Sequence, residues 1–219
     1  MSLEALFAKG GIVVWILAAY SCIALALIIE RLLQLASMRR PPRRFERDLL
    51  AALNEGRAGE LLERLAGPEV AVVRGIVQAA EAGVKNLTLV AIRLGSEQQQ
   101  RMERGFRTLA ILGNTAPLLG LFGTILGLIK AFMVIEQAGG RVDAQALAGG
   151  IWEAMVTTGV GLAVSIPVLL ALHLLEGIAD RRAQSMRGYA SLIIEQFPQA
   201  VVPEDEAAVH HREGVIRAV

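Results

Sequence analysis

One carboxylate, Glu153, lies inside a long apolar stretch of this chain, ALAGGIWEAMVTTGVGLAVSIPVLLALHLL. A charge in hydrocarbon costs at least roughly 2.5 to 3.5 kcal/mol on insertion scales, so such residues usually face a protein interior or a water-filled cavity. Thr157 and Thr158 follow it closely, and Ser165 lies further along. A carboxylate beside hydroxyls and glycines is better suited to a narrow wet passage than to a surface that faces lipid. The alternative is a helix that begins late and leaves Glu153 at the outer interface.

A second apolar stretch, ILGNTAPLLGLFGTILGLIKAF, carries small residues and one proline at intervals of three and four. The members of this stripe are Gly113, Pro117, Gly120, Thr124, Gly127 and Ala131. The spacing keeps them on one helical face, and small residues let helices approach closely in lipid. Helix packing is the expected role of Gly120, Gly123, Gly127, Gly161 and Pro117. Thr124 has a hydroxyl that can bond a proton or a neighbouring helix, and Pro117 is expected to free a carbonyl for water.

Four other polar residues lie in or beside the apolar stretches. Lys130, near the outer end of the second stretch, is expected to snorkel and to act as an anchor rather than as a partner. Glu30 and Arg31 are expected to form an interfacial pair at the membrane edge. His173 is able to relay protons near neutral pH, although a lone histidine there is more often structural.

The composition separates apolar from charged segments. The chain has 219 residues, of which 54% are hydrophobic and 20% charged, and its mean hydropathy is +0.49. The apolar segments 11–36, 109–135 and 148–175 each exceed the ~20 residues that cross a bilayer as a helix. The first is too long for the apolar region of a signal peptide and has no clear cleavage site, so a retained helix is expected. We predict an all-α integral membrane protein with three transmembrane helices and long cytoplasmic helical extensions.

The distribution of lysine and arginine predicts the orientation. Segment 37–108 opens with Arg39, Arg40, Arg43, Arg44 and Arg47, whereas segment 136–147 contains one arginine, Arg141. The positive-inside rule therefore places 37–108 in the cytoplasm. The remaining expected segments are a short periplasmic N-terminus 1–10, a short periplasmic loop 136–147, a cytoplasmic helical extension 176–199 and a flexible cytoplasmic tail 200–219.

The cytoplasmic segments show helical periodicity. In residues 44–66 apolar positions recur at three and four, and NEGRAG interrupts them as a helix-turn-helix junction. A further helical pattern is interrupted at Gly75, Gly83 and Gly95 and runs through SEQQQRMERGFRTLAIL into the second span. Because no turn cluster separates that pattern from the span, one continuous helix is expected there. The third span is expected to continue through EGIADRRAQSMRGYASLIIEQF.

No motif of the sequence supports an enzyme. It has no Walker motif, no dinucleotide fingerprint, no metal-ligand spacing and no nucleophile with a nearby base. We expect no catalytic residues, no cofactor and no metal. The single cysteine, Cys22, can form no internal disulfide.

Two blocks of sequence resemble a known family. GLFGTILGL and GIWEAMVTTGVGLAVSIP are similar to the characteristic segments of the MotA/TolQ/ExbB proton-channel family, and LFAKGGIVVW and IIERL extend the resemblance over most of residues 3–197. Three spans with a long cytoplasmic loop are the plan of ExbB and TolQ rather than of four-span MotA. The resemblance implies a ring, usually a pentamer, around a single-span ExbD or TolR subunit whose membrane aspartate takes part in proton passage. Nucleic acid is not an expected partner, whereas membrane lipid is.

The resemblance also implies roles for single residues. The family's essential third-span glutamate falls on Glu153, its second-span threonine on Thr124 and its third-span threonine on Thr158. Thr157 occupies a position that is commonly alanine in relatives, and His173 stands where the family usually has asparagine. Further residues for the pathway or a pore lining are Thr157, Ser165 and Thr115.

The implied function is that of a proton-conducting subunit of a bacterial inner-membrane motor. Such a motor converts proton motive force into mechanical work on a TonB- or TolA-like protein, for outer-membrane transport or envelope maintenance. The alternative is a non-conducting membrane scaffold that assembles a helical ring for another complex. The sequence leaves open whether the cargo is that of ExbB or of TolQ, and whether the ion is a proton or sodium.

Overall fold

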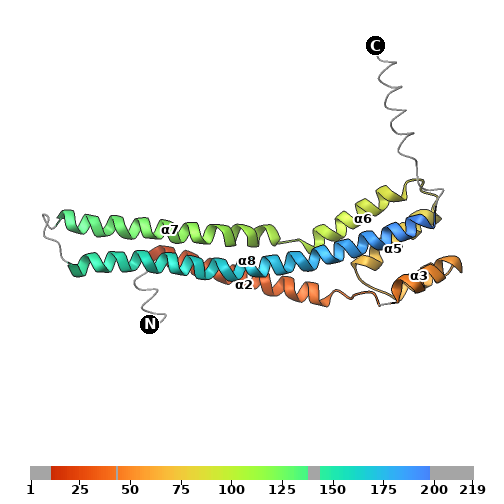
Figure 1. Cartoon of the computed structure of the whole chain (residues 1–219), viewed down its shortest axis with the longest axis horizontal. Coiled ribbons are helices and arrows are strands. Elements are labelled where there is room, and N and C mark those ends of the chain that lie inside the picture. Colours follow the sequence, from red (N-terminus) through yellow and green to blue (C-terminus); the bar gives the residue numbers. More distant parts are fainter. Residues whose placement is uncertain (1–10, 43, 138–143, 198–219) are drawn as a thin grey trace, which may run out of the picture. The chain divides into compact units, whose positions relative to one another are not determined.

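The computed structural model consists of helices and short connections over the residues that it describes, 11–42, 44–137 and 144–197. The helices are α2 (Gly11–Ser37), α3 (Phe45–Asn54), α4 (Ala58–Glu63), α5 (Pro68–Glu81), α6 (Leu87–Met102), α7 (Phe106–Gln137) and α8 (Ala144–Glu195) (Figure 1). The predicted N-terminal segment 1–10 and tail 200–219 lie outside the described residues, as does half of the predicted loop 136–147.

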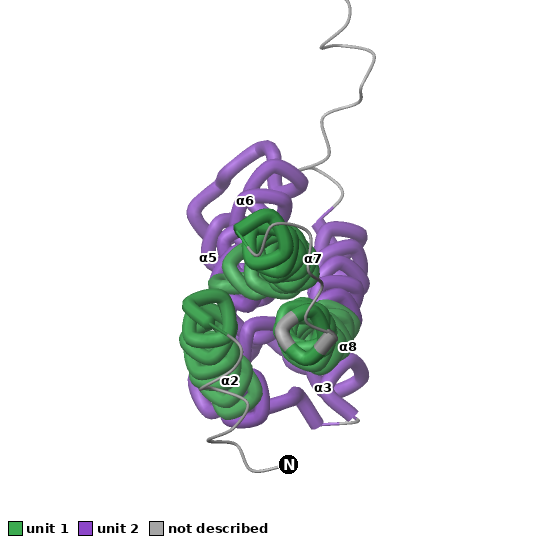
Figure 2. Tube along the Cα trace, turned by 90° about the vertical axis from the view of Figure 1, so that its left-hand side faces the viewer, with its two compact units in different colours: residues 1–34, 103–177 green, residues 35–102, 178–219 purple. Residues whose placement is uncertain are grey.

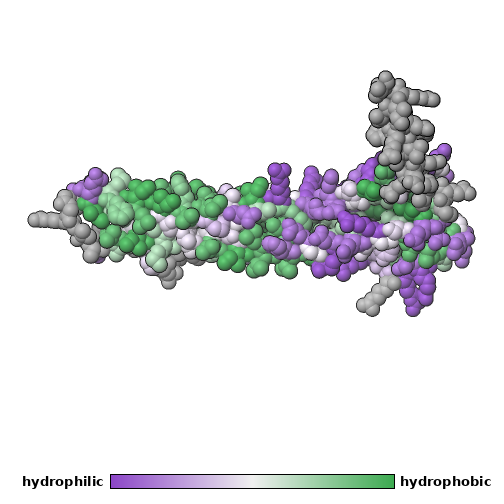
Figure 3. Space-filling model, turned by 45° about the horizontal axis from the view of Figure 1, so that its top comes forward, coloured by the Kyte–Doolittle hydropathy of each residue, from purple (hydrophilic) through white to green (hydrophobic). Residues whose placement is uncertain are grey.

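Helices α2, α7 and α8 are each long and apolar enough to cross a membrane. They contain the predicted spans 11–36, 109–135 and 148–175. Helix α8 has 52 residues, so at ~1.5 Å per residue it measures about 78 Å and extends well beyond a hydrocarbon core of roughly 30 Å. Hydrophobic side chains predominate on the visible face over the apolar segments of the long helices, and hydrophilic side chains are more frequent over the short helices and the second half of α8 (Figure 3). The prediction of an all-α protein with three membrane-crossing helices is confirmed.

The chain divides into two compact units (Figure 2). Unit 1 comprises residues 1–34 and 103–177, and unit 2 comprises 35–102 and 178–219. The described part of unit 1 is therefore a bundle of three helices, namely α2, α7 and the first part of α8. Unit 2 contains α3 to α6 and the remainder of α8.

In unit 1, glycines bring the backbones of α7 and α8 into direct contact. A Cβ atom placed on Gly120 would lie 2.9 Å from the carbonyl oxygen of Thr157, and one on Gly161 would lie 2.8 Å from that of Ala116. Such distances are too short for any side chain, so only glycine permits this separation of the helices. Close packing of this kind is what drives helix association in lipid, where apolar surface gains nothing by leaving the solvent.

Along the line of contact the residue numbers rise in α7 and fall in α8. The contacting pairs are Gly113 with Val168, Gly120 with Gly161, Gly127 with Ala154 and Ala131 with Gly150. Helices α7 and α8 therefore form an antiparallel hairpin (Figure 1). The buried face of α7 differs in part from the predicted stripe, because Ala116 and Gly123 are buried whereas Pro117 and Thr124 are half-buried.

The short helices of unit 2 follow the turn signals only in part. The junction predicted at NEGRAG is present between α3 and α4, where Gly56 has a φ of +69°. Gly83, at φ +73°, separates α5 from α6. The interruptions predicted at Gly75 and Gly95 are wrong, since both glycines lie inside helices. Gly75 serves packing instead, because the side chain of Leu94 occupies the space of its missing Cβ.

A break before α7 replaces the predicted continuous helix. Helix α6 ends at Met102 and α7 begins at Phe106, with Gly105 between them at φ +86°. In unit 1 the guanidinium of Arg31 fills the space beside this glycine, with its Nε 3.3 Å from the position a Cβ would take. The predicted pair is present, since Arg31 Nη2 lies 3.0 Å from Glu30 Oε1. A single glycine in the left-handed region is thus sufficient to stop the helix.

Unit 2 has an ion pair in its interior. Arg182 on α8 donates to Glu69 on α5 at 3.4 Å, and the two side chains are 5% and 3% exposed. The same guanidinium donates to the backbone oxygen of Met38 at 2.6 Å. Glu69 lies in the first turn of α5, where the helix dipole favours a negative charge. The pair therefore joins α5, α8 and the segment after α2 at one buried point.

An aromatic contact connects α3 to the C-terminal part of α8. The rings of Phe45 and Tyr189 meet edge to face, with centroids 5.1 Å apart and planes at 88°. Partial burial, and then the carboxylates of Glu69 and Glu46, raise the pKa of the Tyr189 phenol above its ordinary value. The phenol therefore stays neutral at physiological pH, as packing against an aromatic ring requires.

The glycine contact between α7 and α8 predicts that Gly120→Ala lowers the stability of the protein. The new methyl group would overlap the Thr157 carbonyl, and overpacking typically costs about 1–3 kcal/mol. The matched control is Gly159→Ala, because no atom lies within 4 Å of a Cβ at Gly159, so better helix propensity should leave stability equal or up to about 1 kcal/mol higher. Thermal unfolding of the purified protein in detergent measures both. Equal unfolding temperatures would contradict the packing argument.

The buried ion pair predicts a large difference between neighbouring arginines of α8. Arg182→Met leaves the Glu69 carboxylate buried without its cation, which typically costs about 3–5 kcal/mol. Arg181→Met is the control, because Arg181 is exposed and its loss should change stability by less than about 0.5 kcal/mol. Adding Glu69→Leu to Arg182→Met should restore part of the stability, since no unpaired charge then stays buried. Unfolding in denaturant checks the series, and a similar loss for both arginines would refute it.

Candidate functional site

Glu153 forms an ion pair across the hairpin of unit 1. Its Oε1 lies 2.7 Å from the Nζ of Lys130 on α7. The Glu153 side chain is 22% exposed and that of Lys130 is 60% exposed. The prediction that Lys130 is an anchor rather than a partner is therefore wrong. The long lysine side chain does extend to the helix surface, but its ammonium reaches back to the carboxylate.

The start of α2 closes over this pair. A Cβ atom on Gly11 would lie 2.9 Å from Glu153 Oε1 and 3.9 Å from Lys130 Nζ. Gly11 also has a φ of +61°, a conformation that residues with a Cβ rarely adopt. All three long helices thus contribute to one point, and a larger residue at position 11 would displace the carboxylate.

The pair balances a negative charge inside an apolar helix. An ionised carboxylate in apolar surroundings needs a partner, and an ammonium within hydrogen-bond distance supplies one. A proton on the carboxylate would remove that attraction and free the lysine. Among the described residues, no group of three or more His, Cys, Asp or Glu side chains could hold a metal ion.

Two neighbouring threonines of α8 have different surroundings. Thr158 Oγ1 donates across the hairpin to the backbone oxygen of Gly120 at 3.2 Å. Thr157 is 1% exposed, donates to the oxygen of Ala154 in its own helix at 2.8 Å, and packs directly on Gly123. Within one copy of the chain, Thr157 therefore fills the helix contact, whereas Thr158 is half-buried.

Ser165 bonds the carbonyl that Pro117 frees. Proline has no N–H, so the oxygen of Gly113, four residues earlier, has no donor within α7. Ser165 is 3% exposed, and its Oγ donates to that oxygen at 2.7 Å. Water was the predicted partner of the freed carbonyl, but a side chain of α8 takes this role. The Ser165 hydroxyl thus bonds the carbonyl that a proline inside an apolar helix leaves without its backbone donor.

The other predicted hydroxyls bond within their own helix. Thr124 donates to the oxygen of Leu121 at 2.6 Å, and Thr115 donates to that of Ile111 at 2.7 Å. Both side chains are half-buried. His173 is exposed, and its Nδ1 lies 2.7 Å from the oxygen of Leu169 one turn earlier.

The structure brings together some of these residues and separates others. Glu153 joins Lys130 and Gly11, while Thr158 lies five residues, or about 7.5 Å of rise, further along α8. Ser165 lies another seven residues on. The polar groups thus follow the hairpin as a series of steps and do not form one cluster. Sequence reasoning missed Lys130 and Gly11 as functional candidates. A signal for Lys130 was available, because residues at similar distances from a hairpin loop, one on each helix, are expected to lie close together.

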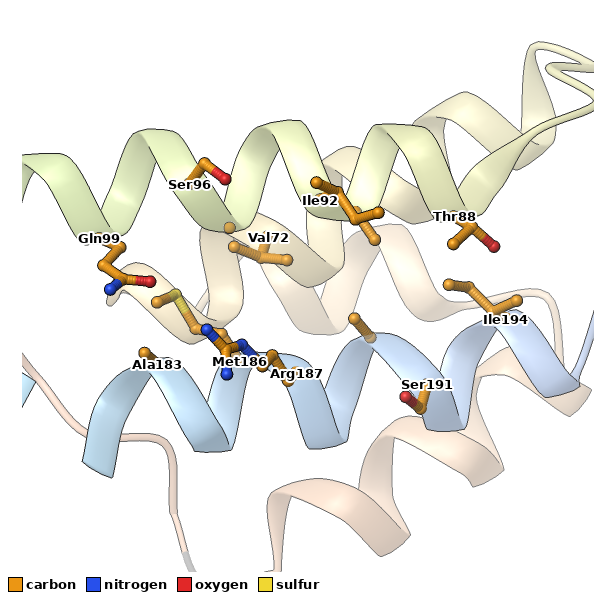
Figure 4. A pocket seen from close by; sticks show the side chains of 13 residues that line it. Val72, Thr88, Ile92, Ser96, Gln99, Ala183, Met186, Arg187, Ser191 and Ile194 are labelled. Atoms are coloured by element: carbon orange, nitrogen blue, oxygen red, sulfur yellow. The ribbon is translucent and has the colours of Figure 1, made fainter. Parts of the chain in front are cut away.

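Unit 2 contains a cavity of about 370 Å³ lined by side chains of α5, α6 and α8 (Figure 4). Val72, Ile92 and Met186 contribute apolar surface, and Gln99 and Arg187 contribute polar groups. None of the predicted site residues lines it. Its side chains suggest no chemistry of their own, so the candidate site remains the ion pair of unit 1.

Comparison with known proteins identifies relatives of the chain. Residues 70–188 match the model of the MotA/TolQ/ExbB proton channel family. The chain is 30% identical to biopolymer transport protein exbB1 of Vibrio cholerae serotype O1 over 203 residues, and this alignment covers 89% of each protein. It is 32% identical over 188 residues to the Tol-Pal system protein TolQ of Haemophilus influenzae, covering 77% of this chain and 81% of TolQ. A shorter match of 45% over 76 residues, about a third of each protein, is to biopolymer transport protein ExbB of Neisseria gonorrhoeae.

The family match includes the candidate site. Residues 70–188 contain Lys130, Glu153 and Thr158. Members of this family are channel subunits associated with transport rather than enzymes, and three helices able to cross a membrane fit a protein of the inner membrane. The chain therefore belongs to the MotA/TolQ/ExbB proton channel family, as a motor subunit similar to ExbB and TolQ.

Proposed function

We propose that this chain is the proton-conducting subunit of a motor of the ExbB–ExbD or TolQ–TolR type in the bacterial inner membrane. The motor converts proton motive force into mechanical work, which a TonB- or TolA-like protein transmits toward the outer membrane. The main support is Glu153, a carboxylate inside an apolar helix that is held by Lys130 where α7 and α8 meet. Proton passage requires such a group, whereas a passive helix bundle does not.

The proposed assembly is a ring of copies, a pentamer by resemblance, around the membrane helix of a single-span ExbD- or TolR-like subunit. Exposed apolar side chains on all three long helices support it, because a ring and its lipid would cover them. They include Trp15 and Leu33 on α2, Leu118 and Phe132 on α7, and Leu170 on α8. The asymmetry in arginine supports a periplasmic N-terminus and a cytoplasmic C-terminus.

The proposed path begins at Glu153 and continues along the hydroxyls of the hairpin. A proton from the outside loads Glu153 or the aspartate of the partner subunit. Thr158 and Thr124 donate their hydroxyl hydrogens to backbone carbonyls, so their oxygens keep lone pairs free to accept a hydrogen bond from water or a protonated acid. We expect both residues to be steps of the path. Further residues proposed for a pore lining are Thr157, Ser165 and Thr115. Within one copy Thr157 and Ser165 are buried between α7 and α8, so their contribution would depend on contacts with neighbouring copies.

The energy available is sufficient for mechanical work. Each charge that crosses the membrane potential supplies about 2.3 kcal/mol per 100 mV. The energy released by the transfer of a few protons therefore exceeds that of several hydrogen bonds, which contribute about 1 kcal/mol each. In the proposed mechanism the ring and the partner's helix rotate relative to each other as the carboxylates load and release protons.

The test of this function is proton flux in vesicles that contain the chain and its co-encoded partner. Glu153→Gln keeps the size of the side chain but cannot bind and release a proton, so flux at an imposed potential should fall to background. Glu136→Gln is the control, because Glu136 is an exposed carboxylate near the same end of α7. It should leave flux unchanged.

The outcomes separate the motor from the scaffold. Full flux from Glu153→Gln at normal protein level would refute a titrating role for Glu153. If neither the assembled wild-type complex nor its Glu136→Gln variant conducts protons, the non-conducting scaffold is favoured instead.

Thr158 provides a second test of the path. Thr158→Val keeps the volume of the side chain and removes the hydroxyl that bonds Gly120, whereas Thr158→Ser keeps the hydroxyl. We expect Val to lower proton flux about tenfold, which corresponds to roughly one lost hydrogen bond in the rate-limiting step, and Ser to conserve it. Flux is measured as for Glu153, with ring assembly checked by size-exclusion chromatography. Equal flux for Val and Ser would remove Thr158 from the path.

A further inference from the structure

We propose that Lys130 is a built-in counter-cation for Glu153, which occupies the carboxylate between protonation events and keeps metal cations away from it. The proposal rests on the proposed function only in assuming that Glu153 binds protons. It gives Lys130 a positioning role, since the lysine would act through Glu153 and would not itself be a step of the proton path.

The geometry around the carboxylate supports this role. Lys130 Nζ lies 2.7 Å from Glu153 Oε1, which is the distance of a strong charge-assisted hydrogen bond. The missing side chain of Gly11 provides the space that this oxygen needs. Residues of three helices therefore meet at the carboxylate, while the lysine side chain stays largely exposed.

The lysine is able to leave the carboxylate without losing its own proton. Its side chain is 60% exposed, and an ammonium on a four-carbon chain is flexible. When a proton binds the carboxylate, the acid becomes neutral and the ammonium turns outward with its charge unchanged. When the proton moves on, the carboxylate is negative again and the ammonium returns. One proton enters and one proton leaves in each cycle.

No other charged group of the described residues is placed to replace Lys130. From α2 the site is faced by Gly11, which is uncharged, and the ionisable residues of α2 further along are Tyr20, Cys22, Glu30 and Arg31. On α7, Glu136 lies six positions beyond Lys130, and Arg107 lies far toward the other end. On α8 the other ionisable side chain within residues 147–175 is His173.

The same contact explains why the site would prefer protons to sodium. Lys130 bonds Oε1 of the carboxylate, so a sodium ion at Glu153 would share the carboxylate with an ammonium and would lie beside a second positive charge. A proton needs no such space, because it bonds to the carboxylate itself. Lys130 thus becomes a specificity determinant for the proposed path.

Labelling with dicyclohexylcarbodiimide tests the proposal without reference to proton flux. This apolar reagent adds to a protonated carboxyl within the membrane, so the rate of labelling at Glu153 reports how often that carboxyl carries a proton. The assay uses the full chain with its co-encoded partner in vesicles. The labelling rate is measured from about pH 6 to about pH 9 in steps of roughly half a pH unit. Mass spectrometry locates the label.

We expect Lys130→Met to be labelled about tenfold faster than the wild type at the alkaline end of the range, because a neighbouring cation favours the ionised carboxyl. Lys130→Arg, which conserves the charge, should be labelled at the wild-type rate. Glu153→Gln should show no label at position 153, which confirms the site of reaction. Identical pH profiles for Lys130→Met, Lys130→Arg and the wild type would overturn the proposal.

Sodium provides the second measurement. In the wild type, sodium chloride should give no more protection from labelling than choline chloride, whereas in Lys130→Met sodium should slow labelling. Protection of the wild type by sodium would refute the exclusion of cations. A failure of the proposed function looks different, because flux would then be absent although the labelling profiles still depend on Lys130.

Discussion

The close approach of α7 and α8 is the constraint on which the rest of unit 1 depends. Apolar helices gain little from each other in lipid unless their backbones come near, and Gly120, Gly127 and Gly161 allow this. Only at that separation can Thr158 and Ser165 reach carbonyls of the other helix. The glycines therefore do more than pack, because they place polar groups of one helix within reach of the other.

The same approach makes a charged residue tolerable inside the apolar helix. At a protein surface an ion pair such as Lys130–Glu153 would contribute little, about 0–1 kcal/mol, because water solvates both charges. In hydrocarbon the alternative to the pair is an unsolvated carboxylate, so the lysine has a much larger effect. In the proposed function a proton replaces the lysine as the group that neutralises the carboxylate.

Unit 2 obeys different rules from unit 1. In unit 2 water competes for every exposed polar group, so the ion pair between Glu69 and Arg182 matters because both side chains are almost fully buried. Positive-φ glycines such as Gly56 and Gly83 divide this unit into short helices. The family match includes residues of both units, since it extends from α5 to the C-terminal part of α8.

The sequence alone determined the three apolar helices and the helical nature of the segments between and after them, and it singled out Glu153 as a candidate, because length, hydropathy and helical period are local properties. It could not determine that Gly105 breaks the chain before α7 while Gly75 and Gly95 do not, since a glycine bends or packs according to its neighbours in space. Nor could it assign Lys130 to Glu153. Only the tertiary structure decided that pairing, because the register of the hairpin is fixed by contacts between residues far apart in the chain.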